Sequence, residues 1–173
     1  MCALRSQAGR RLLHKAAQQS CLPSSHTAII YYSKHHGNTK KLLDAIAEKN
    51  DVTLIDVVQH PQADLKNDDR IGLASGIYYS KFHRSLLKYA AEQLPKGKPV
   101  FFLYTYGAEK KGYTDAVTEA VRARNAKVLG EYGCFGFNTY GPFKLIGGLA
   151  KGHPTKEELE GAVRFYQSLP AVP

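Results

Sequence analysis

The chain has 173 residues, of which 43% are hydrophobic and 23% are charged. This composition is typical of one globular domain and excludes a fibrous or intrinsically disordered protein. No apolar run approaches the roughly 20 residues needed to cross a bilayer, so we expect a soluble protein without a membrane partner. The formal net charge of +9 is partly local, because four of the cations lie in the acid-free residues 1–27. No long Lys/Arg stripe follows, and we expect no nucleic-acid partner.

The first 27 residues are rich in Arg, Gln and Ser and differ from the rest of the chain. Organellar transit peptides share this composition, as do frayed N-termini of cytoplasmic proteins. We therefore expect a basic extension over residues 1–27 and one domain over residues 28–173, in the cytoplasm or, alternatively, in an organelle. The three cysteines, Cys2, Cys21 and Cys134, are widely spaced. Their number and spacing argue against a disulfide framework and against a zinc site.

Short apolar runs alternate with amphipathic stretches from residue 28 onward. In chain order, the pattern predicts a strand at 28–32, a helix at 38–49, strands at 52–58 and 71–75, a helix at 82–94, a strand at 100–105, a helix at 115–125, a strand at 127–137 and a helix at 156–169. Thr155 and Glu158 form a capping box at the start of the last helix. Residues 60–70 contain no clear helix. This alternation predicts an α/β sandwich of three layers around a parallel sheet.

The loop after the first strand carries the clearest functional pattern. It contains Ser33, Lys34, His35, His36, Gly37, Asn38 and Thr39. A strand that passes through a glycine-containing loop into a helix presents unpaired N–H groups and a partial positive charge to an anion. The loop has neither the Walker A pattern nor the dinucleotide-binding glycine pattern. A phosphate monoester therefore fits this loop better than a triphosphate or a dinucleotide.

This loop resembles the phosphate loop of the flavodoxin family, whose usual pattern is Thr/Ser-x-Thr-Gly-x-Thr. Gly37 and Thr39 match the pattern, His36 stands where the middle Thr is usual, and Ser33 lies one residue further out. The resemblance covers residues 28–169 and implies a flavodoxin-like fold with a five-stranded parallel sheet in the order 2-1-3-4-5 and FMN as cofactor. Imidazoles in place of hydroxyls predict phosphate binding that depends on pH, because a dianion favours the protonated ring.

The resemblance also implies two loops beside the flavin ring. The second loop contributes Ser75, Gly76, Ile77 and Tyr78, and the third contributes Tyr104, Thr105, Tyr106 and Gly107. In the family, a Gly-containing peptide of the second loop rotates beside the flavin, and Gly76 matches that position. Tyr78 or Tyr79 could stack on the ring. The long connector over residues 138–154 is expected to form an ordered flap or a partner surface.

No catalytic set stands out in the sequence. We find no serine triad, no H-E-x-x-H and no carboxylate pair, so we expect neither catalytic residues nor a metal site. In flavoproteins the cofactor carries the redox chemistry. We therefore expect an FMN-binding electron carrier whose partners are other redox proteins, and the basic balance favours acidic ones. The alternatives are an NAD(P)H-dependent FMN or quinone reductase, and a flavodoxin-fold module without cofactor.

Overall fold

The computed structural model describes residues 26–140, 145 and 147–172. Residues 1–25, which hold nearly all of the expected basic extension, lie outside this range. The elements in chain order are β1 (Thr27–Tyr32), α1 (Asn38–Lys49), β2 (Thr53–Asp56), β3 (Arg70–Tyr78), β4 (Lys81–Phe82), α2 (Arg84–Glu92), β5 (Pro99–Tyr106), α3 (Asp115–Arg122), β6 (Lys127–Phe135) and α4 (Lys156–Ser168).

Five parallel strands form the sheet in the order β2-β1-β3-β5-β6. This is the predicted architecture and the predicted strand order. The short strand β4 was not predicted, and it pairs antiparallel with the end of β3 through Ile77↔Phe82 and Tyr78↔Lys81. That pairing explains why β3 continues to Tyr78 beyond the predicted end at residue 75.

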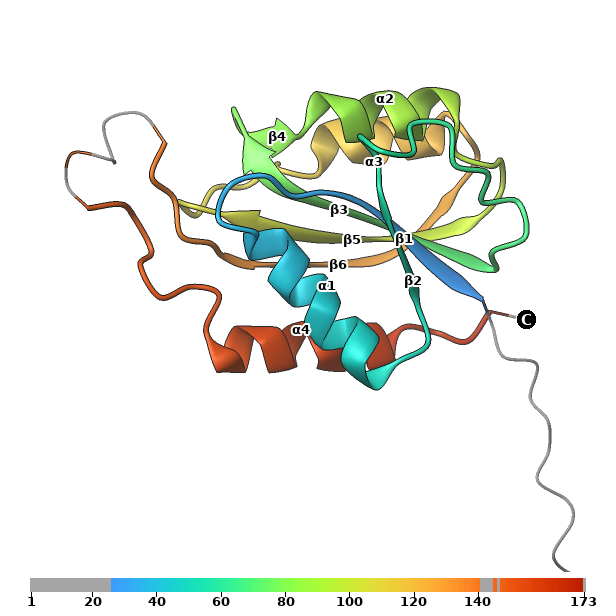
Figure 1. Ribbon diagram of the computed structural model, residues 1–173. Coiled ribbons are helices and arrows are strands. Elements are labelled where there is room, and N and C mark those ends of the chain that lie inside the picture. Colours follow the sequence, from blue (N-terminus) through green and yellow to red (C-terminus); the bar gives the residue numbers. More distant parts are fainter. Residues whose placement is uncertain (1–25, 141–144, 146, 173) are drawn as a thin grey trace, which may run out of the picture.

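Helices α1 and α4 cover one face of the sheet, and α2 and α3 cover the other (Figure 1). The neighbouring residues Ile29 and Ile30 of β1 serve opposite layers, because successive side chains of a strand point to opposite faces. The same alternation places Phe101 of β5 in the α1–α4 layer and Phe102 in the α2–α3 layer. All four side chains are fully buried.

Two helices differ from their predicted bounds, and the start of a third agrees with the prediction. Helix α2 begins at Arg84 because His83 is its N-cap, and the His83 ring accepts a hydrogen bond from the Ser85 amide. Helix α3 ends at Arg122, three residues before Asn125, which has a φ of +55°. The predicted capping box of α4 is confirmed, with Thr155 at the N-cap. None of the helices in the described part of the chain is long and apolar enough to cross a membrane.

Candidate functional site

A pocket opens at the carboxyl edge of the sheet, where β1, β3, β5 and β6 end. It holds about 730 Å³ of empty space, its open mouth included. Nine of the residues predicted for the site line it together: Ser33, His35, Asn38, Thr39, Gly76, Ile77, Tyr78, Thr105 and Gly107. The structure therefore brings the three predicted loops to one cavity.

The first loop turns sharply before it enters α1. His36 and Gly37 both have positive φ, at +54° and +63°. Gly37 is the N-cap of α1, and no side chain caps the helix there. The positive end of the helix dipole is therefore available to an anion. Ser33 closes the loop on its other side, because its hydroxyl accepts a hydrogen bond from the Lys40 amide at 3.2 Å.

Two buried side chains of the first turn of α1 face the pocket. The hydroxyls of Thr39 and Thr105 are 2.9 Å apart and hydrogen-bonded. The Asn38 side-chain NH₂ donates to the Phe137 carbonyl at 2.8 Å, whereas its Oδ1 is buried without a partner among the described residues. A buried acceptor without a partner destabilises a fold by about 1–3 kcal/mol. Asn38 lines the pocket, so this unpaired acceptor belongs to a residue of the pocket wall.

The four residues predicted for the second loop, 75–78, form the end of β3 and not a loop, and the tight turn follows them with Tyr79 and Ser80 at positive φ. The ring of Tyr78 is half-buried and lies against the rings of Tyr32, His83 and His35. Burial raises the pKa of Tyr78, with a smaller contribution from Tyr32, so its hydroxyl stays neutral. A Cβ on Gly76 would lie 3.3 Å from the Tyr78 ring. Gly76 therefore gives this tyrosine its place on the pocket wall.

His83 packs flat against Tyr32 on the outer side of this wall, with ring centroids 3.6 Å apart. Burial lowers the pKa of His83, and the charges of Arg84 and Lys34 lower it further. The His83 amide donates to the Ser75 hydroxyl at 3.0 Å. Ser75 is buried and uses its hydroxyl inside the protein, where it also donates to the Gly76 carbonyl. It supports the pocket from behind and does not line it.

Of the four residues predicted for the third loop, Thr105 and Gly107 line the pocket, and the other two pack inside the protein. Tyr104 and Tyr106 do not line the cavity, because their rings pack against Tyr113 and, for Tyr106, against Phe135. Burial raises the pKa of both tyrosines, that of Tyr104 to about 12 with help from Glu131. The other predicted residues outside the lining are Lys34, His36, Gly37 and Ser75.

Tyr79, which the sequence offered as an alternative to Tyr78, also lines the pocket, as do four residues that the sequence reasoning did not assign to it: Gly136, Phe137, Asn138 and Tyr140. Most of them follow β6, whose end shares the carboxyl edge with the other strands. Asn138 is held by a pair of backbone hydrogen bonds with Leu149. A Cβ on Gly107 would lie 2.6 Å from the side-chain nitrogen of Asn138. The sequence did hold a signal for these residues, because a glycine, an aromatic residue and an asparagine (Gly136, Phe137 and Asn138) follow one another at the end of a predicted strand.

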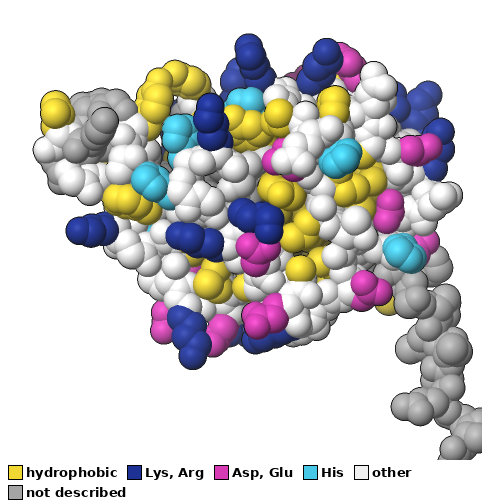
Figure 2. All heavy atoms as spheres, viewed as in Figure 1, with side chains coloured by type: hydrophobic (Ala, Val, Ile, Leu, Met, Phe, Trp, Pro, Cys, Tyr) yellow, Lys and Arg dark blue, Asp and Glu magenta, His cyan; other side chains and the backbone are white. Residues whose placement is uncertain are grey.

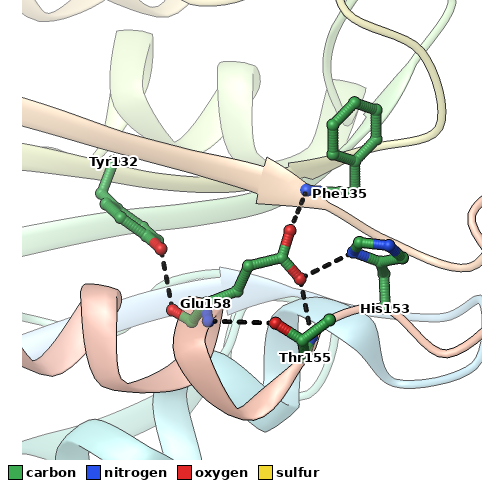
Figure 3. Close-up of polar contacts among 5 residues, drawn as sticks. All are labelled: Tyr132, Phe135, His153, Thr155 and Glu158. Carbon is green, nitrogen blue, oxygen red and sulfur yellow. Dashed lines mark hydrogen bonds and ion pairs between the residues drawn. The ribbon is translucent and has the colours of Figure 1, made fainter.

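Glu158 fastens the segment after β6 to helix α4 (Figure 3). One carboxylate oxygen accepts from the Phe135 amide at 3.3 Å, and the other accepts from the Thr155 amide at 2.6 Å and contacts the His153 ring nitrogen at 2.8 Å. The His153 carbonyl in turn accepts from the Phe137 amide. One carboxylate therefore joins the helix N-terminus, the strand end and the chain that returns to the pocket.

The pocket offers binding groups rather than reactive ones. Its titratable lining residues are His35 and the three tyrosines Tyr78, Tyr79 and Tyr140. In the described part of the chain, no group of three or more His, Cys, Asp and Glu side chains is placed to hold a metal ion. Cys134 of β6 is buried, with only 4% of its surface exposed. Burial raises the pKa of its thiol to about 12. The arrangement suits an anion at the α1 end and a flat ring between aromatic walls.

Comparison with known proteins places these observations in a family. The family model for the flavodoxin domain matches residues 29–139. An uncharacterized protein from Methanocaldococcus jannaschii is 33% identical over 143 residues, which cover 82% of this chain and 95% of the relative. A flavodoxin from the domain Archaea superposes with a TM-score of 0.59 at 22% identity, covering 80% of this chain and 92% of that one.

A further solved structure with the same fold is general stress protein 14 from Treponema denticola, determined in complex with FMN. It superposes with a TM-score of 0.56 at 14% identity, covering 83% of this chain and 95% of that one. At such identities the two structural matches show the shared fold.

Proposed function

The chain belongs to the flavodoxin domain family, and from this premise we propose that it binds FMN in the carboxyl-edge pocket and acts as a redox protein. The proposed contacts are the predicted residues that line the pocket: Ser33, His35, Asn38 and Thr39 for the phosphate side, and Gly76, Ile77, Tyr78, Thr105 and Gly107 for the ring side. To these we add Asn138 and Tyr140. When bound, FMN supplies the electron-transfer chemistry that the protein's own side chains lack.

The observation that carries the proposal is the donor and acceptor set at the start of α1. Gly37, the N-cap of α1, has no side chain to cap the helix, and apart from the Lys40 amide that Ser33 takes up, this helix end suits a phosphate beside the Thr39 hydroxyl. The unpaired Oδ1 of Asn38 needs a donor, and a phosphate dianion has none. A ligand that carries both a phosphate and neighbouring hydroxyl groups satisfies the two requirements together, and FMN carries its phosphate on a polyhydroxylated chain.

The ring side of the pocket suits a flavin because it offers flat aromatic side chains and an uncharged tyrosine hydroxyl. Tyr78 and Tyr79 offer aromatic faces at the cavity, and Tyr140 lies beside Tyr79. Burial raises the pKa of Tyr78, so this wall presents a neutral hydroxyl to the ring. Among the described lining residues no carboxylate accompanies His35, which favours an electron carrier, with other redox proteins as partners, over an enzyme that needs a proton relay.

A titration of the apoprotein with FMN, followed by flavin absorbance and fluorescence quenching, tests the proposal. We expect saturable one-to-one binding. Thr39→Val should raise the FMN Kd by about tenfold or more, because a hydrogen bond to a charged group contributes about 1.5–3 kcal/mol. Thr27→Val is the matched control, since Thr27 is equally buried but lies at the opposite end of β1. If the protein does not bind FMN, or if the two substitutions change the FMN Kd equally, FMN binding at this site is refuted.

The same preparation distinguishes the carrier from the reductase. Steady oxidation of NADPH or NADH by the FMN-loaded protein, without a second protein, would favour an NAD(P)H-dependent reductase. We expect no such turnover, and we expect chemically reduced holoprotein to pass its electrons to protein acceptors instead.

A further inference from the structure

Two exposed aromatic side chains meet at the mouth of the pocket. Tyr79 is 82% exposed and Tyr140 is 57% exposed, although aromatic side chains are usually far more buried than this. Their hydroxyls are hydrogen-bonded at 2.6 Å, and their rings lie edge to face. The two residues come from segments 61 positions apart, the β3–β4 turn and the chain after β6. Rigid, exposed tyrosines of this kind are typical anchors of protein interfaces.

Four lysines lie in the segments that adjoin this tyrosine pair or the pocket, and we call them the basic rim: Lys34, Lys81, Lys110 and its sequence neighbour Lys111. All four are exposed. Lys81 pairs with Tyr78 in the short hairpin, and the Lys110 ammonium donates to the Ser80 hydroxyl at 3.2 Å. Lys34 is near enough to His83 for its charge to lower the pKa of that ring. The rim thus comprises side chains from three loops gathered around one mouth.

The cations of the rim lack the ion pairs that some other cations of this protein form. Residues 33–37, 79–83 and 107–114 contain one acidic residue, Glu109, against the four lysines. Within the described residues, none of the four forms an ion pair. By contrast, Lys40, Lys88 and Arg164 each pair with an acid one helical turn away. This end of the molecule therefore combines an exposed aromatic pair with loops that hold four lysines and one acid.

The surface view agrees with this distribution (Figure 2). At the left end of the face shown, where the strands of Figure 1 finish, dark blue, cyan and yellow side chains lie together. Most of the magenta acidic side chains lie along the lower edge and on the right side. The lysines outnumber the acids in the loops at the pocket mouth, and their charge would steer an acidic surface toward the pocket.

We propose that the basic rim and the Tyr79–Tyr140 pair form the docking surface for an acidic partner protein, which meets this chain over the mouth of the pocket. The inference rests on the proposed redox function, because an electron carrier must present its pocket edge to its partner. The aromatic pair would supply the apolar centre of the contact and the lysines its charged periphery. The cations stand in separate loops around an opening. A single-stranded nucleic acid calls instead for a positive groove that tracks its backbone.

A binding assay with a labelled acidic peptide tests this surface on the full-length holoprotein. The probe is fluorescein-labelled poly-L-glutamate of about 20 residues, followed by anisotropy at low and high salt. We expect binding that weakens with salt, and a loss of about tenfold or more in affinity for the double variant Lys81→Glu, Lys110→Glu. The matched control is Lys96→Glu, Lys127→Glu, which changes the net charge equally at the opposite edge of the sheet, where both lysines are exposed.

A lysine acetylation footprint locates the contact. Poly-L-glutamate should protect Lys81, Lys110 and Lys111 from acetylation and leave Lys96 and Lys127 reactive. Equal losses in the two double variants, or an unprotected rim, would overturn the proposal, because overall charge alone would then explain binding. Stronger rim-dependent binding of a 20-nucleotide single-stranded DNA, or of phosphatidylserine vesicles, would overturn it as well.

The failure of this surface can be told apart from the failure of the proposed function. Both double variants should keep the FMN Kd of the wild-type protein, because none of their four lysines lines the pocket. A chain that binds FMN but shows no difference between the variants lacks the docking surface alone. A chain that takes up no FMN refutes the redox function, and with it the premise of this inference.

Discussion

The middle of the sheet and its carboxyl edge differ in how their space is filled. At Gly72 in β3, an added Cβ would lie 2.7 Å from Phe101 and 2.9 Å from Ile29, so no room remains. At Gly37 in the first loop, nothing lies within 4 Å of the same position. The centre is closed by its own side chains, whereas the edge keeps space and an unpaired acceptor, Asn38 Oδ1. The protein thus separates the residues that hold the fold from those that can hold a ligand.

The largest effect should come from filling the closed region. Gly72→Val would force three carbons against Phe101 and Ile29, and we expect it to lower the free energy of unfolding by about 3 kcal/mol or more. For a domain of this size the Tm would fall by about 6–12 °C in calorimetry. Gly97→Val is the control, because Gly97 has a φ of +75° and open space, so backbone strain acts there without overpacking. Equal losses in the two variants would contradict the packing explanation.

The sequence reveals the closed region well, because burial leaves a periodic pattern. The alternation of Ile29 with Ile30 and of Phe101 with Phe102 comes from the two-residue period of a strand between two helical layers. The order of the five parallel strands followed from the family resemblance, and the structure confirms it. The two-residue strand β4 escaped prediction because nothing in so short a segment is periodic.

Only some of the residues that line the pocket at the carboxyl edge could be predicted from the sequence, and the reason is physical. The predicted loops reach the pocket because parallel strands end at one edge, and this reasoning located Thr39, Gly76 and Gly107. It could not decide which way successive side chains point. Tyr104 and Tyr106 therefore turned out to pack with Tyr113 instead of lining the cavity. The contribution from the end of β6 depends on contacts more than 60 residues apart in sequence, which local patterns do not encode.

A smaller effect is expected at the junction between the two regions. Glu158→Gln keeps the shape but removes the charge that accepts from the Phe135 and Thr155 amides and contacts His153. We expect a loss of about 1–3 kcal/mol in the free energy of unfolding, measured by urea titration. Glu157→Gln is a close control, because this neighbouring acid lies exposed in the same first turn of α4. It should change stability by less than about 0.5 kcal/mol.

The open edge can be tested with two glycines that share one backbone conformation. Gly37 and Gly97 have φ values of +63° and +75°, and both have free space at the Cβ position. An alanine at either should cost about 1 kcal/mol of stability, because L-residues disfavour this region. Gly37→Ala should in addition raise the FMN Kd by about fivefold as the strained cap of α1 relaxes. Isothermal titration of both variants decides whether the affinity effect belongs to the first loop, and equal FMN affinities would show that it does not.

The smallest effect is expected at Cys134, just inside the boundary between the two regions. Burial, and to a lesser degree Glu158, raises the pKa of its thiol to about 12. Only the thiolate reacts with alkylating agents, so native Cys2→Ser, Cys21→Ser protein should take up no iodoacetamide at pH 8, as read by mass spectrometry, and should react fully in urea. The raised pKa also means that this thiol favours the folded state fully below its unfolded pKa of about 8.5. That contribution is lost as the pH rises from there toward 12, because the unfolded chain then releases a proton that the folded chain retains. Rapid labelling of the folded protein at pH 8 would show that the edge is open further inward than Thr105 and Asn38.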